Sequence, residues 1–530
     1  MRFRGPLADS YPAAAAMVAL SLIPYLALSS AMQPLQQVIE QRLQLSPQAF
    51  QLTSGMANAA YAFGTVLAVQ LAMRFRRRRL LVRYSALLVA SSVVAAAAPS
   101  SGLFIAAHIV QGFCTSLMLI AAVPPLVVGW PVAKMPITAM VMNLCVFGAV
   151  ALGPVVGGIQ AGGGDWHILF WCVAGCAVAS FLLVVLTFED VPPADEHAPW
   201  DFISLMLAGC GCAAAFFGAS ELMTHRMLSV IVFLPLLGGL GLLLVLIVHQ
   251  SSVKDPLIPV RELFTTKPVA GILVAMTAGA ASVAAIELIE QAIKPTGTPG
   301  HLATLFWPEF GAAVFMAVIF GAMLRTRALT ALAFGGLIVL AGGIAIVTGI
   351  VGGGHWLVID AAALIGIGVG ASVAPALFVA GYSVRSSLIQ RVFALVELLR
   401  AVAAFMTAPL IVHLAMTVNG GTSSGGIRTG MWVCFAIVVT GAGLALVVFL
   451  LGGAKLQQPD LERWQEGEQP AWDSPPLLDV PRRINAAAAE LPRRPPLSPR
   501  GEWFDGRYGE GPDDGYGARR TDGRREAARR

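Results

Sequence analysis

Several polar or ionisable side chains interrupt the long apolar runs of this sequence, and these groups can bind a proton or a charged substrate. They are His108, Gln111, Glu287, Glu290, Glu309, Glu397 and Arg400. A charge inside an apolar run is costly to keep, so each is a candidate for function. An imidazole titrates near neutral pH, so His108 can exchange protons. A neutral histidine bonded to a neighbouring group is the structural alternative.

The carboxylates near residue 300 have two possible roles. Glu287 and Glu290 are three residues apart, so a helix places them on one face, where paired carboxylates can share a proton. They also close a predicted span, and a solvated helix end is the alternative. Glu309 follows Pro308 near the start of the next span, where the helix dipole alone can stabilise an acid.

Glu397 and Arg400 lie deeper in their span, within RVFALVELLRAVAAF. Their spacing of three residues predicts an ion pair on one helix. A structural pair inside the protein is the favoured interpretation. A pair that rearranges between two conformations of the protein is the alternative.

The elements that must position these groups are membrane-spanning helices. Of the 530 residues, 57% are hydrophobic and 12% charged, and the mean hydropathy is +0.74, whereas soluble domains carry about 25% charged residues. Apolar runs of about 20 residues fit a bilayer, in which helices satisfy their own backbone. We predict an all-α membrane protein with about fourteen spans, near residues 11–33, 51–73, 81–98, 102–129, 137–161, 166–188, 201–223, 227–249, 268–290, 302–324, 328–352, 355–383, 391–416 and 430–453.

Basic residues predict which side of the membrane each loop faces, because cytoplasmic loops are enriched in Lys and Arg. One set of alternate loops holds 14 of them, namely Arg74, Arg76, Arg77, Arg78, Arg79, Arg83, Lys134, Lys254, Arg261, Lys267, Arg325, Arg327, Arg385 and Arg391. The other set holds 4, namely Arg42, Arg226, Lys294 and Arg428. We expect the first set, and both termini, to be cytoplasmic in a cell-membrane protein. The run LAMRFRRRRLLV then marks a cytoplasmic loop, and no nucleic-acid partner is expected.

Two parts of the chain resemble each other. The spans at 102–129 and 355–383 both run from glycine and small residues to a proline, and basic loops recur at the same offset of eight spans. This offset predicts two six-helix bundles, residues 1–190 and 266–453, with two intervening spans in 191–265. Such repeats are typical of secondary transporters. Residues 454–530 are rich in Pro, Gly, Arg and Asp and are expected to form a disordered cytoplasmic tail.

The run GAVALGPVVGG, residues 148–158, resembles the helix-five motif of the fourteen-helix drug:proton antiporters of the major facilitator superfamily. The motif positions are Gly148, Gly153, Pro154, Gly157 and Gly158. Small residues let this helix approach a neighbour closely, and the proline bends it. HIVQGFCTS resembles the family's Arg-x-x-Gln-Gly motif, with His108 in place of the arginine. The resemblance covers about residues 11–453 and implies the major facilitator fold.

The basic loop is similar to the signature loop of the same family, Gly-x-Leu-Ala-Asp-Arg-x-Gly-Arg-Arg, which holds the two bundles together. Arg74, Arg77 and Arg78 match its basic positions, whereas Met73 stands at the position of the aspartate. Tyr25 stands where the family's first helix carries its acid, and a tyrosine with a pKa of about 10 has no proton to give near neutral pH.

The resemblance implies a secondary transporter that exports small apolar or cationic molecules in exchange for protons. Its expected partners are the bilayer, a small-molecule substrate and protons, with no cofactor. The sequence has no Gly-x-x-x-x-Gly-Lys-Ser/Thr, nucleophile-elbow or His-Glu-x-x-His pattern, so no ATP site, enzymatic activity or metal site is expected. Because the helix-one acid is missing, two alternatives stay open: an uncoupled facilitator, and a scaffold or sensor that has lost transport.

Overall fold

A computed structural model describes residues 5–188, 199–254, 256–293, 299–350, 355–418, 424–467 and 469–477. In these ranges the chain is helical apart from turns, loops and one isolated β-bridge between Thr265 and Pro476. The described residues belong to one compact unit, Met1–Asp479.

The long helices match the predicted spans in number. In chain order the elements are α1 (Tyr11–Leu43), α2 (Pro47–Arg74), α3 (Arg77–Ala96), α4 (Ser101–Val128), η1 (Val132–Lys134), α5 (Met135–Asn143), η2 (Leu144–Gly148), α6 (Ala149–Gly162), α7 (His167–Thr187), α8 (Phe202–Glu221), α9 (Val230–Ser252), α10 (Val260–Leu263), α11 (Thr266–Ile293), α12 (Pro299–Met323), α13 (Ala328–Ile350), α14 (His355–Tyr382), η3 (Ser386–Leu388), α15 (Ile389–Thr417), α16 (Ser424–Leu451) and α17 (Leu461–Gln465). Within the described ranges, 14 helical segments are long and apolar enough to cross a membrane. The predicted all-α membrane fold with about fourteen spans is therefore confirmed.

Local sequence explains where the first two helices begin and end. Ser10 and Ser46 cap α1 and α2 by accepting hydrogen bonds from the backbone N–H groups of Ala13 and Ala49, and a proline follows each cap. Gln44 closes α1 with a φ of 51°. The first span is longer than predicted. The helix continues past residue 33, where the purely apolar run ends, through a more polar stretch to Leu43.

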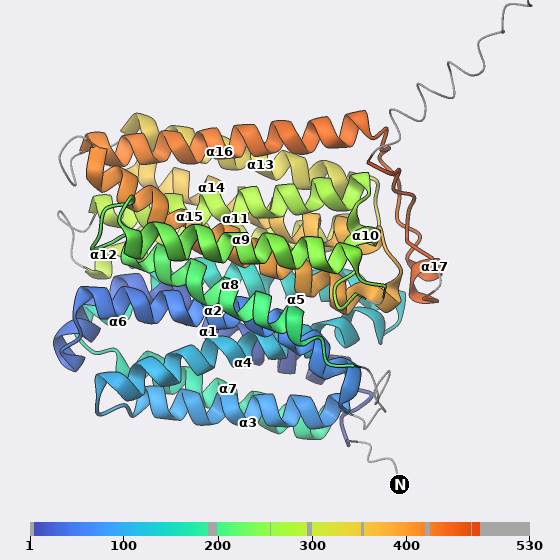
Figure 1. The fold of residues 1–530 in the computed structure, drawn as a ribbon, viewed down its shortest axis with the longest axis horizontal. Helices are drawn as coiled ribbons and strands as arrows, with labels where there is room; N and C mark the ends of the chain where they lie inside the picture. The colour runs from blue at the N-terminus through green and yellow to red at the C-terminus, as the bar shows by residue number, and fades with distance from the viewer. Residues whose placement is uncertain are drawn as a thin grey trace, which may run out of the picture. The chain divides into compact units, whose positions relative to one another are not determined.

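The helices pack in two groups with a pair between them (Figure 1). In the first group, α1 packs on α4, α6 and α7, and α3 packs on α4 and α7. In the second, α11 packs on α14, α15 and α16, and α13 packs on α14 and α16. The intervening α8 and α9 pack on each other, and α8 packs on α2. Contacts of α2 with α15, and of α6 with α12, join the two groups. The division into bundles at residues 190 and 265 stays a prediction, since the groups share one compact unit.

The fifth predicted span is interrupted inside the membrane-length segment. It begins as a 3-10 turn and a short helix, α5, and then widens into the π-helical segment Leu144–Gly148 before α6. A π-helical turn is rare and is frequently found at functional sites. Here it ends at Gly148, the first glycine of the helix-five motif.

The expectation of disorder from residue 454 onward is wrong for the part of the tail that the structure describes. Residues 454–467 and 469–477 pack against the helices, with Trp464 and Trp472 buried. Composition favoured disorder because proline and charge dominate this stretch, yet two tryptophans supply enough apolar surface to hold it in place. Most of the remaining tail, residues 478–530, lies outside the described residues.

Candidate functional site

A cavity lies between the two helix groups. Its empty volume, including the part that is open to solvent, is about 990 Å³. The first group contributes polar side chains from α1 and α2, namely Ser29, Ser30, Gln33, Ser54 and Asn58. The second group contributes the charged side chains Glu287, Glu290, Glu309 and Arg400. Four of the seven residues singled out from the sequence therefore meet in one place.

Glu309 of α12 and Glu290 of α11 bring carboxyl groups into this cavity. Each residue is only 3% exposed. The Oε2 atom of Glu309 is buried and has no hydrogen-bond partner among the described residues. Glu309 belongs to the lining of the cavity, so its buried carboxyl group lies beside the space that a proton or a small molecule would occupy.

The predicted ion pair between Glu397 and Arg400 is present and buried. Arg400 Nε donates to Glu397 Oε2 at 2.9 Å, and Arg400 Nη2 also contacts Glu397 Oε1. The hydroxyl of Tyr61 on α2 donates to the same Oε1 atom at 2.7 Å. Arg400 also lies over the ring of Phe147, 5.7 Å from its centroid. Both α2 and the π-helical segment belong to the first group, so the ion pair of α15 is tied to both groups.

No pattern in the sequence singles out Tyr61 or Phe147 as partners of this pair. Aromatic residues in apolar spans are common and usually pack in the core. Only the contact of α2 with α15 brings Tyr61 and Glu397 together across 336 positions of sequence.

His108 lies apart from the cavity, in the packed interior of the first group. It is 1% exposed, and its Nδ1 atom is 3.2 Å from Oε1 of Gln111. Nε2 of Gln111 in turn donates to the hydroxyl of Ser92 at 3.1 Å. The imidazole stacks on Phe104, with 6.0 Å between centroids and 2° between planes. Neither His108 nor Gln111 is among the described lining residues of the cavity, which favours the structural alternative for His108.

Tyr25, which the sequence resemblance aligns with the acid of the first helix, is buried against the same cluster. Its ring is 5.6 Å from the imidazole of His108 and 6.5 Å from the ring of Tyr61. Its hydroxyl has no hydrogen-bond partner among the described residues. Tyr25 therefore fills space between α1, α2 and α4, next to the tyrosine that holds Glu397.

The helix-five motif lies where α6 meets α1. A Cβ atom on Gly157 would come within 2.8 Å of the carbonyl oxygen of Ala31, and one on Gly153 within 2.0 Å of the hydroxyl oxygen of Ser30. These glycines therefore let the two backbones approach more closely than any side chain allows. Gly158 is buried in the same helix, and Pro154 lines the cavity.

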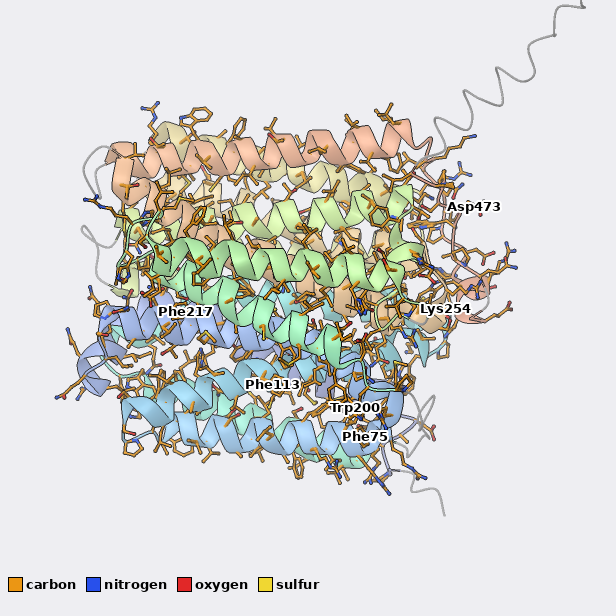
Figure 2. All side chains as sticks on the ribbon, in the orientation of Figure 1. Phe75, Phe113, Trp200, Phe217, Lys254 and Asp473 are labelled. Atoms are coloured by element: carbon orange, nitrogen blue, oxygen red, sulfur yellow. The ribbon has the colours of Figure 1, made fainter. Side chains whose placement is uncertain are left out.

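The basic loop lies at the end of the helices where α17 packs, called here the α17 end (Figure 1). Arg74 closes α2 and lies over the ring of Trp200, 4.8 Å from its centroid. Figure 2 shows Trp200 beside Phe75 at this end, where Lys254 and Asp473 also lie. Arg77 begins α3, and Arg78 follows it, half-buried.

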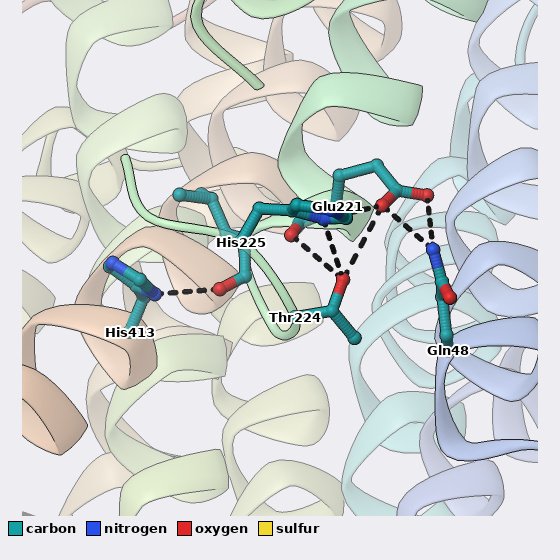
Figure 3. Close-up of polar contacts among 6 residues, drawn as sticks. Gln48, Glu221, Thr224, His225 and His413 are labelled. Atoms are coloured by element: carbon teal, nitrogen blue, oxygen red, sulfur yellow. Dashed lines mark hydrogen bonds and ion pairs between the residues drawn. The ribbon is translucent and has the colours of Figure 1, made fainter. Parts of the chain in front are cut away.

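The opposite end of the helices carries a second polar cluster, on the connection between α8 and α9 (Figure 3). Glu221 accepts a hydrogen bond from Gln48 Nε2 at 2.9 Å and pairs with His225 Nδ1 at 3.0 Å. The ring of His413 on α15 bonds the carbonyl oxygen of Leu222 at 2.6 Å. A smaller cavity of about 600 Å³ shares Gln33, Ser54, Asn58 and Glu287 with the central cavity and reaches toward this end.

The described part of the chain contains no group of three or more His, Cys, Asp or Glu side chains that could hold a metal ion. The arrangement therefore offers carboxylates and neutral polar groups, which bind protons, cations and hydrogen-bonding molecules.

Comparisons with known proteins agree with this architecture. The sequence profile described as Major Facilitator Superfamily matches residues 14–408. The human organic anion transporter MFSD10 has a similar fold: its crystal structure aligns with a TM-score of 0.55 at 14% identity, over 84% of this chain and 100% of that one.

Three relatives come from Bacillus subtilis strain 168. The chain is 29% identical over 187 residues to the uncharacterized MFS-type transporter YubD, and 24% identical over 212 residues to the uncharacterized MFS-type transporter YcnB. It is 25% identical over 165 residues to the lincomycin resistance protein LmrB. These matches cover 34%, 40% and 31% of this chain and 36%, 43% and 34% of the respective relatives, so the chain aligns with less than half the length of each.

Proposed function

The chain belongs to the Major Facilitator Superfamily, a family of membrane transporters, and on this premise we propose that it exports small cationic or apolar molecules in exchange for protons. The central cavity carries this proposal. Three carboxylates line it, whereas Arg400, the one cation among its described lining residues, is already paired with Glu397. The cavity therefore favours a positively charged occupant. The resistance to lincomycin named for LmrB supports an exporter.

Glu309 is the proposed proton carrier, in place of the acid that is missing from α1. An ionised carboxylate buried without a cation is expensive, so a proton is the natural counter-ion of Glu309 when the cavity excludes water. A cationic substrate neutralises the same carboxylate. The proton and the substrate therefore compete for the carboxyl group of Glu309. Because only one of them binds at a time, export of the substrate is coupled to import of a proton. Glu287 and Glu290 add to the negative charge that attracts the substrate.

Movement of the two helix groups against each other would expose the cavity to one side and then to the other. We place the α17 end, with the basic loops, in the cytoplasm of a cell-membrane protein, because the loops at this end hold most of the Lys and Arg residues. Both termini are proposed to be cytoplasmic as well. The cavity of about 600 Å³ that continues toward the opposite end then supports an outward-directed path.

An uncoupled facilitator is the second candidate, favoured by Tyr25 at the position of the helix-one acid. Transport of a fluorescent organic cation in proteoliposomes with an imposed pH gradient separates the two. In the antiporter, the gradient drives accumulation, and Glu309→Gln abolishes the accumulation while downhill exchange continues. Glu262→Gln changes an exposed carboxylate on α10 and serves as the matched control.

Each outcome of this assay has a distinct meaning. Cation movement that ignores the pH gradient in the unaltered protein supports the facilitator. Absence of cation movement under every gradient contradicts transport of this substrate class and supports a scaffold or sensor. Full gradient-driven accumulation by Glu309→Gln removes Glu309 as the carrier.

A further inference from the structure

Residues 454–467 and 469–477 form a segment, called here the strap, that packs across the α17 end of the helices. It contains the short helix α17 and is coloured orange-red at the edge of Figure 1. The strap follows the last long helix, α16, and it contacts both helix groups.

The strap binds the second group through its two tryptophans. Trp464 is fully buried, and its Nε1 donates to the carbonyl oxygen of Val384 at 2.8 Å. Its ring packs edge-on against Tyr382, with 4.9 Å between centroids. Nε1 of Trp472 donates to the hydroxyl of Ser383 at 2.8 Å. Tyr382 is the last residue of α14, and Ser383 and Val384 follow it in the connection to α15.

The neighbouring residue binds the first group. Nε2 of Gln465 donates to the carbonyl oxygen of Val128 at 2.9 Å and also to that of Trp130. These carbonyls lie at the end of α4 and in its connection to α5. Trp464 and Gln465 are consecutive residues of α17, so one helical turn bridges the two groups.

The start of α11 anchors the rest of the strap. Lys267 is fully buried; its Nζ donates to Gln457 Oε1 at 2.9 Å and lies 4.5 Å from the ring centroid of Trp472. Its backbone N–H donates to the hydroxyl of Ser474 at 3.0 Å, and that of Thr266 donates to the carbonyl oxygen of Pro475 at 2.9 Å. The strap thus has many bonds to the second group and fewer to the first.

We propose that the strap is a built-in lock that keeps the α17 end closed, and that the bonds of Gln465 are the ones that break when this end opens. The inference rests on the proposed function, because it needs the two groups to separate during transport. Gln465 is bonded to the α4–α5 connection and Trp464 to the α14–α15 connection. The two connections cannot move apart while both residues keep these bonds. When this end opens, the hydrogen bonds of Gln465 to the first group break first, because the buried tryptophans and Lys267 fix the strap to the second group.

The distance between two spin labels tests the lock without any measurement of transport. Labels at Ala133→Cys and Ser387→Cys, in a background without the native cysteines, sit on exposed positions of the two connections. Gln465→Ala should increase the population with a long distance roughly two- to tenfold, as expected for the loss of one or two hydrogen bonds. Trp464→Ala should increase it further. Gln458→Ala changes an exposed glutamine of the strap and should leave the distribution unchanged.

The outcomes separate the lock from the transport mechanism. If the unaltered protein shows both distances and Gln465→Ala behaves like Gln458→Ala, the lock is refuted while alternating access stands. If neither the unaltered protein nor any variant shows a second distance, also with a cationic substrate and a pH gradient, the proposed separation of the groups fails and the lock fails with it. A long-distance population that rises in Gln465→Ala supports the lock, whatever the transported substrate proves to be.

Discussion

Arg391 of α15 points its guanidinium group at Met73 of α2. Nη2 lies 3.7 Å from the sulfur of Met73, and Nη1 donates to the carbonyl oxygen of Pro256 at 3.3 Å. A cation of the second helix group thus faces Met73, the position for which the sequence resemblance implies an aspartate. An acid at position 73 would therefore lie within reach of the guanidinium group of Arg391.

Met73→Asp should therefore create an ion pair with Arg391 that ties the two groups together at the α17 end. Partly exposed pairs contribute up to about 1 kcal/mol, so transport should slow by roughly fivefold. Initial rates of cation transport measure this effect. Met73→Asn is the control, because the asparagine side chain has nearly the same shape as aspartate and carries no charge. If Met73→Asp slows transport equally in an Arg391→Gln background, the effect does not come from the pair.

Gly157→Leu should abolish transport while the protein still reaches the membrane. A side chain there meets Ala31 across the α1–α6 contact, and overpacking costs about 1–3 kcal/mol. Gly175→Leu is the matched control, because a Cβ on Gly175 meets no atom within 4 Å. Normal transport by Gly157→Leu at normal expression would contradict the packing role of the helix-five motif.

The sequence predicted the helices well because a helix is the structure in which a single apolar span satisfies its own backbone in lipid. It also predicted the pair of Glu397 and Arg400, since both residues belong to one helix and a spacing of three residues fixes their geometry. Both predictions depend on local sequence alone and not on how the helices pack against one another.

Contacts between distant segments were beyond such patterns. The bond of Tyr61 to Glu397 and the path of the strap depend on how the two helix groups meet. The strap was mistaken for disordered chain because its composition is polar and proline-rich, whereas two buried tryptophans decide its position. His108 was singled out by residue type and neighbouring motif, which cannot tell a cavity wall from a packed interior.

Arg400→Gln should lower the stability of the purified protein strongly. It leaves Glu397 buried without its cation, and breaking a buried pair costs about 3–5 kcal/mol. The double variant Glu397→Gln with Arg400→Gln removes both charges and should recover much of the loss. Thermal unfolding in detergent compares them, with Arg385→Gln as an exposed control. A double variant as unstable as the single one would show that the stranded charge is not the cause.

Glu309 and His108 should respond in opposite ways when each is removed. Both are buried, but Glu309 lines the cavity and His108 packs between Phe104 and Tyr25. His108→Ala leaves a hole in the first helix group, and such truncations of large buried side chains cost about 2–5 kcal/mol. It should therefore lower the unfolding temperature and leave the pH dependence of cation transport intact. Glu309→Gln keeps the shape of the side chain, so it should leave the unfolding temperature nearly unchanged and remove that pH dependence. Paired measurements of unfolding temperature and transport at several pH values check both expectations. If His108→Ala loses its pH dependence at normal stability, the histidine carries the proton despite its distance from the cavity wall.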